Sequence, residues 1–177
     1  DEIVVFSWLE YPSKAVRDAA TKKMMEDPRM KTIGEGMPFD GKRMIYGGFE
    51  VMFQAGKAGT AGYVDGMLLA VPTAGRKDVE AWGNTMAALF TKHGATRVVR
   101  GWGDDVPDGK VTDFKRAVQA KPDETVICGW VEWPSKEKRD AGWKTMMTER
   151  EMQPGHAAPP FDGQRMVYGG FAPIVEG

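Results

Sequence analysis

Apolar residues along the chain follow two kinds of spacing, one typical of strands and one typical of helices. Residues Glu2 to Tyr11, Tyr63 to Val71 and Ala95 to Asp104 are rich in β-branched and aromatic side chains, so each predicts a strand. Apolar positions recur at helical spacing within Lys14 to Met25 and within residues 75–93, which predicts two amphipathic helices. The pattern therefore predicts an α+β protein.

Capping and turn residues add further elements. Ser13 is placed to cap the first of these helices, and Asp27-Pro28 has the form of a second, short helix start. Residues 114–120 fit either a strand or a helical turn. We favour a strand, joined as a hairpin to a strand over residues 125–133.

The chain contains an internal repeat. Residues 39–49 read FDGKRMIYGGF and residues 161–171 read FDGQRMVYGGF, and each copy predicts an Asp-Gly turn that enters a strand. A constant offset of 122 residues relates these two stretches, and it also relates Trp8 to Trp130 and the residues around them. A constant offset over so long a stretch indicates duplicated modules.

The order of the predicted elements defines the modules. Residues 63–177 give strand, helix, strand twice, with an extra hairpin strand between, which predicts a complete ferredoxin-like (split βαβ) module with an antiparallel sheet and two helices on one face. Residues 1–54 match the C-terminal half of a first module, strand-helix-strand, and the glycine-rich residues 55–62 predict a flexible linker. Because an apolar sheet face is unfavourable in water, we expect two sheets to pack face to face as a two-sheet α/β barrel.

Two arrangements account for the odd number of half-modules. Either an N-terminal half-module is missing before residue 1, or residues 1–54 pair with strands from residues 63–104. The second arrangement is sterically reasonable because a short linker can join neighbouring antiparallel strands, but it leaves residues 112–177 without a partner. We therefore expect a truncated tandem.

Charge and cysteine content exclude several classes of function. With 24 Lys and Arg against 25 Asp and Glu, the chain has no excess that favours nucleic acid or an anionic membrane as a partner. The single Cys128 excludes an intrachain disulfide and favours a reducing compartment, so we expect a cytoplasmic protein. His93 and His156 stand alone, and we expect neither a metal nor a cofactor.

Four strings carry a resemblance to a known family. They are Tyr63-Val64-Asp65-Gly66, Trp102 to Phe114, Trp130 to Lys136, and the repeated Phe-Asp-Gly-x-Arg-Met-x-Tyr-Gly-Gly-Phe. On these strings the sequence resembles the bacterial YbaA-like family, a domain of unknown function, over all of residues 63–177 and over residues 1–54 as a half-module. The family is similar to the dimeric α/β barrel proteins, which implies self-association as a dimer or as an intramolecular pseudo-dimer of modules. It implies no activity and no catalytic residues.

Strand alternation suggests a candidate ligand pocket. Along residues 125–133, Trp130 and Glu132 share a face with Cys128, and the small and β-branched residues of the other face suit packing under a helix. We therefore expect the Trp-Glu face to line the barrel interior. The expected pocket combines Trp102, Trp130 and Tyr168 with Glu132, Asp104 and Arg100, and the first copy repeats it with Trp8, Glu10 and Tyr46.

Two classes of function fit these residues. In the first, the pocket binds a small molecule and supports cofactor-free acid/base or oxygen chemistry, with Glu132, Asp104 and Arg100 as candidate catalytic groups. In the second, the protein is a non-enzymatic oligomeric or interaction protein, its aromatic residues form ordinary core, and Glu132 pairs with an arginine at a strand end. A void between the sheets favours the first class, and a face filled by side chains favours the second.

Overall fold

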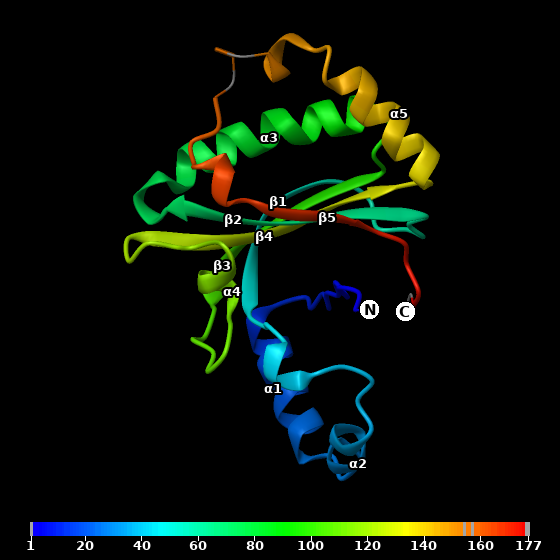
Figure 1. Cartoon of the computed structure of the whole chain (residues 1–177), viewed down its shortest axis with the longest axis vertical. Coiled ribbons are helices and arrows are strands. Elements are labelled where there is room, and N and C mark those ends of the chain that lie inside the picture. Colours follow the sequence, from blue (N-terminus) through cyan, green and yellow to red (C-terminus); the bar gives the residue numbers. More distant parts are fainter. Residues whose placement is uncertain (1, 154, 157, 176–177) are drawn as a thin grey trace.

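A single antiparallel sheet forms the centre of the protein. The computed structural model describes residues 2–153, 155–156 and 158–175, and among these residues five strands pair in the order β1-β3-β4-β2-β5 (Figure 1). The strands are β1 (Gly48–Gly56), β2 (Tyr63–Pro72), β3 (Arg97–Asp105), β4 (Glu124–Trp133) and β5 (Val167–Phe171). The predicted α+β class is confirmed.

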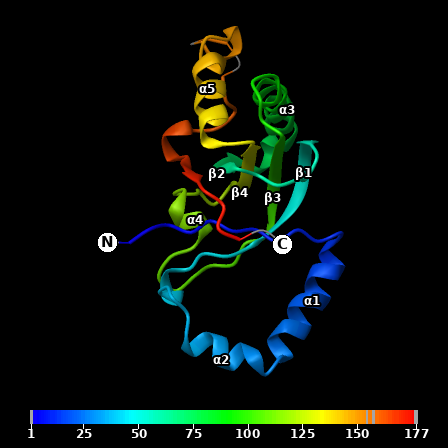
Figure 2. The ribbon, with the colours of Figure 1, turned by 90° about the vertical axis from the view of Figure 1, so that its right-hand side faces the viewer.

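Helices lie on both sides of this sheet but cover only one of them. Figure 1 shows α3 (Arg76–Lys92) and α5 (Lys136–Met146) lying along the upper face. On the lower side are α1 (Lys14–Glu26), α2 (Arg29–Glu35) and the short α4 (Phe114–Ala117), and the side view in Figure 2 shows α1 and α2 extending away from the sheet. The upper helices therefore build the main core.

The core beneath α3 and α5 follows from helical and strand spacing. Phe90 of α3 packs edge-on against the buried Trp133 of β4, with ring centroids 6.1 Å apart. Met146 of α5 and Val131 of β4 are buried in the same cluster. Because every second residue of β4 points to this side, the strand contributes alternate side chains to it and leaves Trp130 and Glu132 for the other face.

The predicted helices are confirmed, and their caps explain why. The Ser13 hydroxyl accepts a hydrogen bond from the amide of Val16 at the start of α1, and Ser135 accepts one from Lys138 at the start of α5. The second helix predicted from Asp27-Pro28 is α2. These signals act over three or four residues, so the sequence alone carries them.

The strand predicted over Glu2–Tyr11 is wrong. In the structure this segment is extended but belongs to no strand, and none of its amides makes a backbone hydrogen bond within the described part of the chain. β-branched and aromatic residues favour a strand only when a neighbouring strand supplies the ladder. Here the segment lies across a face of the sheet rather than along an edge, and its side chains pack on that face.

The two repeated strands are shorter or later than predicted. Over residues 39–49 the chain forms a 3₁₀ turn (Gly41–Arg43), and the strand begins only at Gly48 and runs into the stretch predicted as linker. Over residues 161–171 the strand begins only at Val167. The repeated aspartate causes the turn, because Asp40 accepts from the amide of Lys42 just as Asp162 does from Gln164.

The strand favoured over residues 114–120 is also wrong, and the helical alternative is correct. Residues 114–117 form α4, whose first turn is capped by the Asp113 side chain accepting from the amide of Arg116 at 2.7 Å. The helical spacing of Phe114, Ala117 and Val118, together with the aspartate cap, was the better signal.

The second sheet of the predicted barrel is not among the described residues. The sheet that is present is open rather than closed on itself. β1 and β5 are its two edge strands. Arg165, just before β5, donates two hydrogen bonds to Glu124 at the start of β4. That guanidinium lowers the pKa of Glu124 to about 2. The lower face of the sheet is where the predicted site residues must be sought.

Candidate functional site

Strand register decides which side chains share the lower face. Directly opposite residues of antiparallel strands lie on the same face, and Glu132 of β4 lies opposite Arg97 of β3 and Val64 of β2. Trp130 lies opposite Val99 in the same way. The lower face therefore carries Arg97, Trp130 and Glu132 together.

The segment of residues 2–11 lies over this face. Trp8 stacks on Trp130 with ring centroids 4.8 Å apart and planes 28° apart, and Phe6 stacks on Phe171 of β5 at 5.4 Å. A Cβ at Gly66 would lie 3.1 Å from ring atoms of Phe6, so the glycine of β2 allows this ring to approach the sheet. The lower face is filled by side chains of the chain itself.

A network of ion pairs and hydrogen bonds holds residues 2–11 against this face. Arg97 donates to Glu10 at 2.5 and 2.9 Å and to Glu132 at 3.3 Å, and Glu132 also accepts from the indole nitrogen of Trp130 at 2.9 Å. Arg97 and Glu132 are buried. Hydrogen bonding to Glu10, followed by the charge of Glu10 and of Glu132, raises the pKa of Arg97. The network binds segment 2–11 to β3 and β4 and leaves Glu132 already engaged by two donors.

This arrangement is the strand-end arginine that the sequence left open as an alternative. Arg97 is the first residue of β3, and sequence reasoning did not name it. The pairing of Arg97 with Glu132 follows from the register of β3 against β4, and the sequence alone does not fix that register. Of the predicted pocket residues, Trp8, Glu10, Trp130 and Glu132 are brought together.

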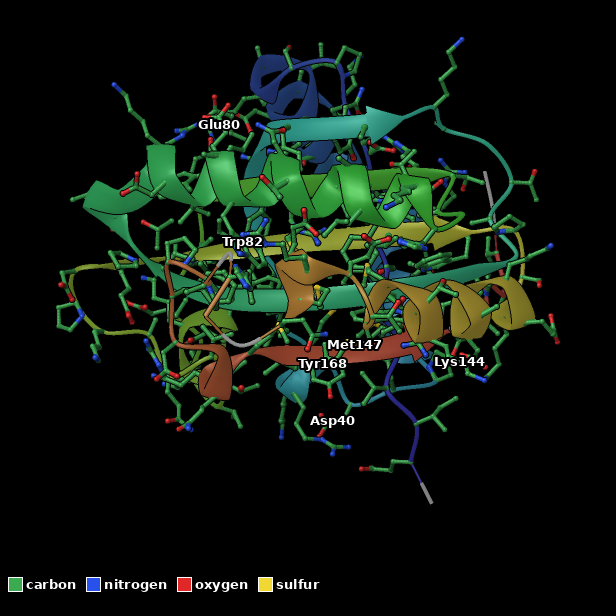
Figure 3. The ribbon with its side chains drawn as sticks, turned by 90° about the horizontal axis from the view of Figure 1, so that it is seen from above. Asp40, Glu80, Trp82, Lys144, Met147 and Tyr168 are labelled. Atoms are coloured by element: carbon green, nitrogen blue, oxygen red, sulfur yellow. The ribbon has the colours of Figure 1, made fainter. Side chains whose placement is uncertain are left out.

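Three of the predicted pocket residues lie on the opposite, helix-covered face. Arg100 lies opposite Gly129 and Trp102 opposite Ile127, so both point away from Trp130. Tyr168 of β5 lies opposite Met67, and Figure 3 shows it exposed on the side of the helices. The common face predicted for these residues and Trp130 is wrong, because alternation within a strand does not fix the phase between strands.

Two further predicted residues lie far from a pocket. Asp104, near the end of β3, has a partly exposed side chain 3.7 Å from the amine of Lys14. Tyr46 is exposed between the 3₁₀ turn and β1. Neither meets the buried carboxylate of Glu132.

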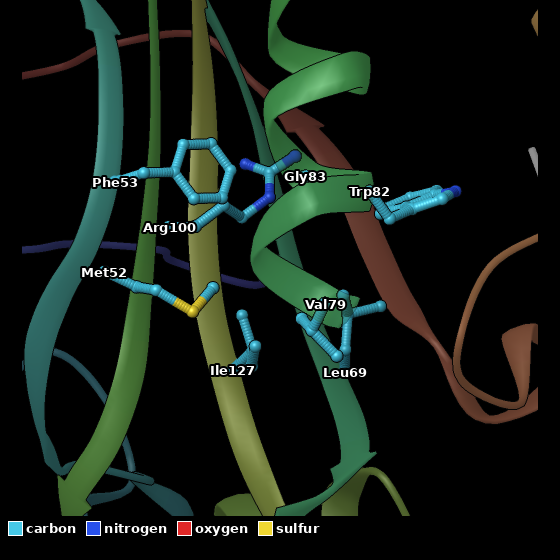
Figure 4. A pocket seen from close by; sticks show the side chains of 8 residues that line it. All are labelled: Met52, Phe53, Leu69, Val79, Trp82, Gly83, Arg100 and Ile127. Atoms are coloured by element: carbon cyan, nitrogen blue, oxygen red, sulfur yellow. The ribbon is translucent and has the colours of Figure 1, made fainter. Parts of the chain in front are cut away.

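Arg100 lines a small cavity between the sheet and α3 (Figure 4). Its guanidinium donates to the backbone oxygens of Val99 at 2.9 Å and Trp130 at 3.3 Å, and among the described residues it forms no ion pair. The cavity has a volume of about 10 Å³, room for about one water molecule. Its walls are formed mainly by apolar groups, Met52, Phe53, Leu69, Val79, Trp82, Gly83 and Ile127.

Burial of this unpaired cation has a cost. Desolvation lowers the pKa of Arg100 to about 10, so the charged form is disfavoured in the fold. At neutral pH the side chain is nevertheless charged in both the folded and the unfolded states. The folded state therefore loses stability below pH 10, and this loss diminishes as the pH rises through 10.

We expect Arg100→Met to stabilise the protein by about 1–4 kcal/mol, because a buried charge gives way to a side chain that suits the apolar cavity. Urea denaturation at pH 7 measures the change. Arg29→Met, at an exposed site, is the control and should change the free energy of unfolding by less than about 0.5 kcal/mol. A loss of stability in Arg100→Met would show that its two carbonyl contacts outweigh the desolvation.

Other places offer little for chemistry. A shallow groove of about 450 Å³ is lined by exposed residues, Thr32, Ile33, Gly36, Met37, Pro38 and Phe39. Burial raises the pKa of the Cys128 thiol to about 11, so it is protonated at neutral pH. Within the described residues, no three His, Cys, Asp or Glu side chains gather as metal ligands would, and no helix is long and apolar enough to cross a membrane.

A second buried carboxylate was also missed by sequence reasoning. Asp65 of β2 accepts from the indoles of Trp133 at 3.0 Å and Trp143 at 2.9 Å and forms an ion pair with Arg139 at 2.8 Å. Its signal was an aspartate in the middle of an otherwise apolar strand. It braces β2, β4 and α5 on the upper face.

Comparison with known proteins identifies relatives of unknown function. The family described as "Protein of unknown function (DUF1428)" matches residues 1–41 and 62–163. The chain is 46% identical over 114 residues to the uncharacterized protein YbaA of Escherichia coli strain K12, an alignment that covers 64% of this chain and 97% of the relative. The uncharacterized YbaA of Shigella flexneri gives the same identity and coverage.

Proposed function

Because the chain belongs to the DUF1428 family of proteins of unknown function, we propose a role from its geometry: it is a non-enzymatic assembly protein whose module binds a matching module through the lower sheet face. The partner is a second module, in the same chain or in another copy. In this chain, residues 2–11 occupy the binding face.

One observation carries this proposal: equivalent residues of the two repeats contact each other. Trp8 stacks on Trp130, its equivalent at the offset of 122 residues, and Glu10 binds the same arginine as its equivalent Glu132. Contacts between equivalent residues are the signature of an isologous interface near its twofold axis. Residues 2–11 therefore stand in the place of the β4 strand of a second module.

The strand order supports a ferredoxin-like module. Without β1, the strands run β5-β2-β4-β3, and α3 and α5 lie on one face, as the split βαβ arrangement requires. In the assembly that we propose, two such modules face each other across Trp130 and its equivalent. This is the two-sheet barrel in which each sheet covers the apolar face of the other.

The contents of the lower face favour assembly over a ligand pocket. Phe6 and Trp8 cover the sheet there, and Arg97 forms ion pairs with the carboxylates of Glu10 and Glu132. On the opposite face, the cavity beside Arg100 has about 10 Å³, whereas a pocket for a small organic molecule usually has several hundred Å³. Packing of this kind suits an interface between modules.

A variant that releases the segment tests this role. We expect the double variant Trp8→Ala and Glu10→Ala to uncover the lower face and to form a discrete dimer at tens of micromolar, with a larger mass than the wild type in sedimentation experiments. Tyr46→Ala with Tyr168→Ala removes two exposed aromatic side chains and serves as the control. An uncovered variant with the wild-type mass would refute the assembly role.

A further inference from the structure

Residues 2–11 have a second side whose apolar residues are exposed. Val5 is 64% exposed, whereas its equivalent Ile127 is 1% exposed. Leu9 is 78% exposed, whereas its equivalent Val131 is fully buried. The same positions of the repeat are therefore covered in one copy and open to water in the other.

The following helix shows the same contrast. Met24 of α1 is 46% exposed, whereas its equivalent Met146 of α5 is fully buried. α1 has no buried residue among those described, although the repeat gives it the cap and spacing of α5. The segment and the helix after it therefore both expose apolar residues whose equivalents in the second copy are buried.

The second copy shows what covers this surface. Ile127 packs against Leu69 of β2 and Val79 of α3. Val131 and Met146 are buried with Phe90 of α3. The cover is thus the unit β2-α3-β3, residues 63–105, in which two strands flank β4 and a helix lies over it.

A conserved charge in the repeat points to the same partner. Arg139 of α5 pairs with the buried Asp65 of β2. The equivalent of Arg139 is Arg17 of α1, which here contacts the exposed Asp18 and Asp105 instead. A β2-type strand would offer Arg17 the buried carboxylate that the fold gives to Arg139.

We propose that Val5, Leu9, Met24 and the surface around them form a docking face for a further copy of the strand-helix-strand unit of residues 63–105. Docking would turn residues 2–11 into a central strand between two new neighbours. This goes beyond the assembly role, because Trp8 and Glu10 face the lower side of the sheet and Val5 and Leu9 alternate to the opposite side.

A fusion that restores the repeat period tests this docking. A second copy of residues 62–122 placed directly before Asp1 keeps the offset of 122 residues and gives each repeat its own copy of residues 63–105. We expect amide hydrogen exchange over residues 2–11 to slow by at least about 100-fold relative to the wild-type chain, because these amides would enter a sheet ladder. Leu9→Asp in the same fusion places a charge in the buried face and should abolish the protection.

Three results would overturn the proposal. The added unit could fold while residues 2–11 exchange at the wild-type rate. It could remain unfolded, although the docking face should complete it. The wild-type chain could already protect Val5 and Leu9 in a dimer, which would make the occupant a second whole chain. A positive fusion result combined with a monomeric Trp8→Ala, Glu10→Ala variant would refute only the assembly role.

Discussion

Arg97→Ala is expected to destabilise the protein by about 3–5 kcal/mol and to detach residues 2–11 from the sheet. The variant leaves the buried carboxylate of Glu132 without its cation and removes the arginine that holds Glu10. Glu10 is partly exposed and can return to water, so the segment is the part that leaves. Urea denaturation measures the loss in the free energy of unfolding. Tryptophan fluorescence, to which Trp8 contributes, reports the exposure of the segment to water.

Two matched variants separate charge from packing. Glu10→Gln keeps one carboxylate for Arg97 and should cost clearly less than Arg97→Ala, because Glu132 remains paired. Arg29→Ala removes an exposed arginine of α2 and should change stability by less than about 1 kcal/mol. Equal losses of stability in Arg97→Ala and Arg29→Ala would mean that the ion pairs of Arg97 contribute no more than an exposed pair.

Asp65→Ala is expected to destabilise the protein by a similar amount, about 3–5 kcal/mol. The carboxylate accepts from the buried indole of Trp133 and the partly buried indole of Trp143 and pairs with Arg139. Its removal leaves both indoles without this acceptor and leaves Arg139 with Asp140 as its ion-pair partner. In contrast to Arg97→Ala, this change loosens the packing of α5 on the sheet. Near-UV circular dichroism of the tryptophans and thermal unfolding measure it.

Asp65→Asn provides the matched control. Its amide oxygen can still accept from one indole, but it cannot pair with Arg139, so we expect an intermediate loss of stability. A full retention of stability in Asp65→Ala would show that the upper face is held by apolar packing alone. The order of stability should be wild type, Asp65→Asn, Asp65→Ala.

Local signals explain which elements could be predicted from the sequence. Ser13 and Ser135 cap their helices with hydroxyls three residues from their partners, and β2 is a long apolar run that ends at Pro72. Each of these features is decided within one turn or one strand. Helices and inner strands could therefore be located before the structure was known.

Features that depend on distant partners could not be predicted. Residues 2–11 have the composition of a strand, and the absence of a neighbour leaves them extended without a ladder. Arg100 and Trp102 were placed beside Trp130 because each strand alternates, but the register of β3 against β4 puts Arg97 there. Long-range register, rather than residue type, decided the composition of the site.

The contact between equivalent residues of the two repeats can be observed directly by NMR in the wild-type chain. Nuclear Overhauser effects between the indole protons of Trp8 and Trp130 report ring separations of a few ångströms, and their centroids are 4.8 Å apart. We expect clear cross-peaks between these two rings and none between Trp8 and Trp102, which lies on the opposite face. Absence of the Trp8–Trp130 cross-peaks would contradict the packing of one repeat on the other.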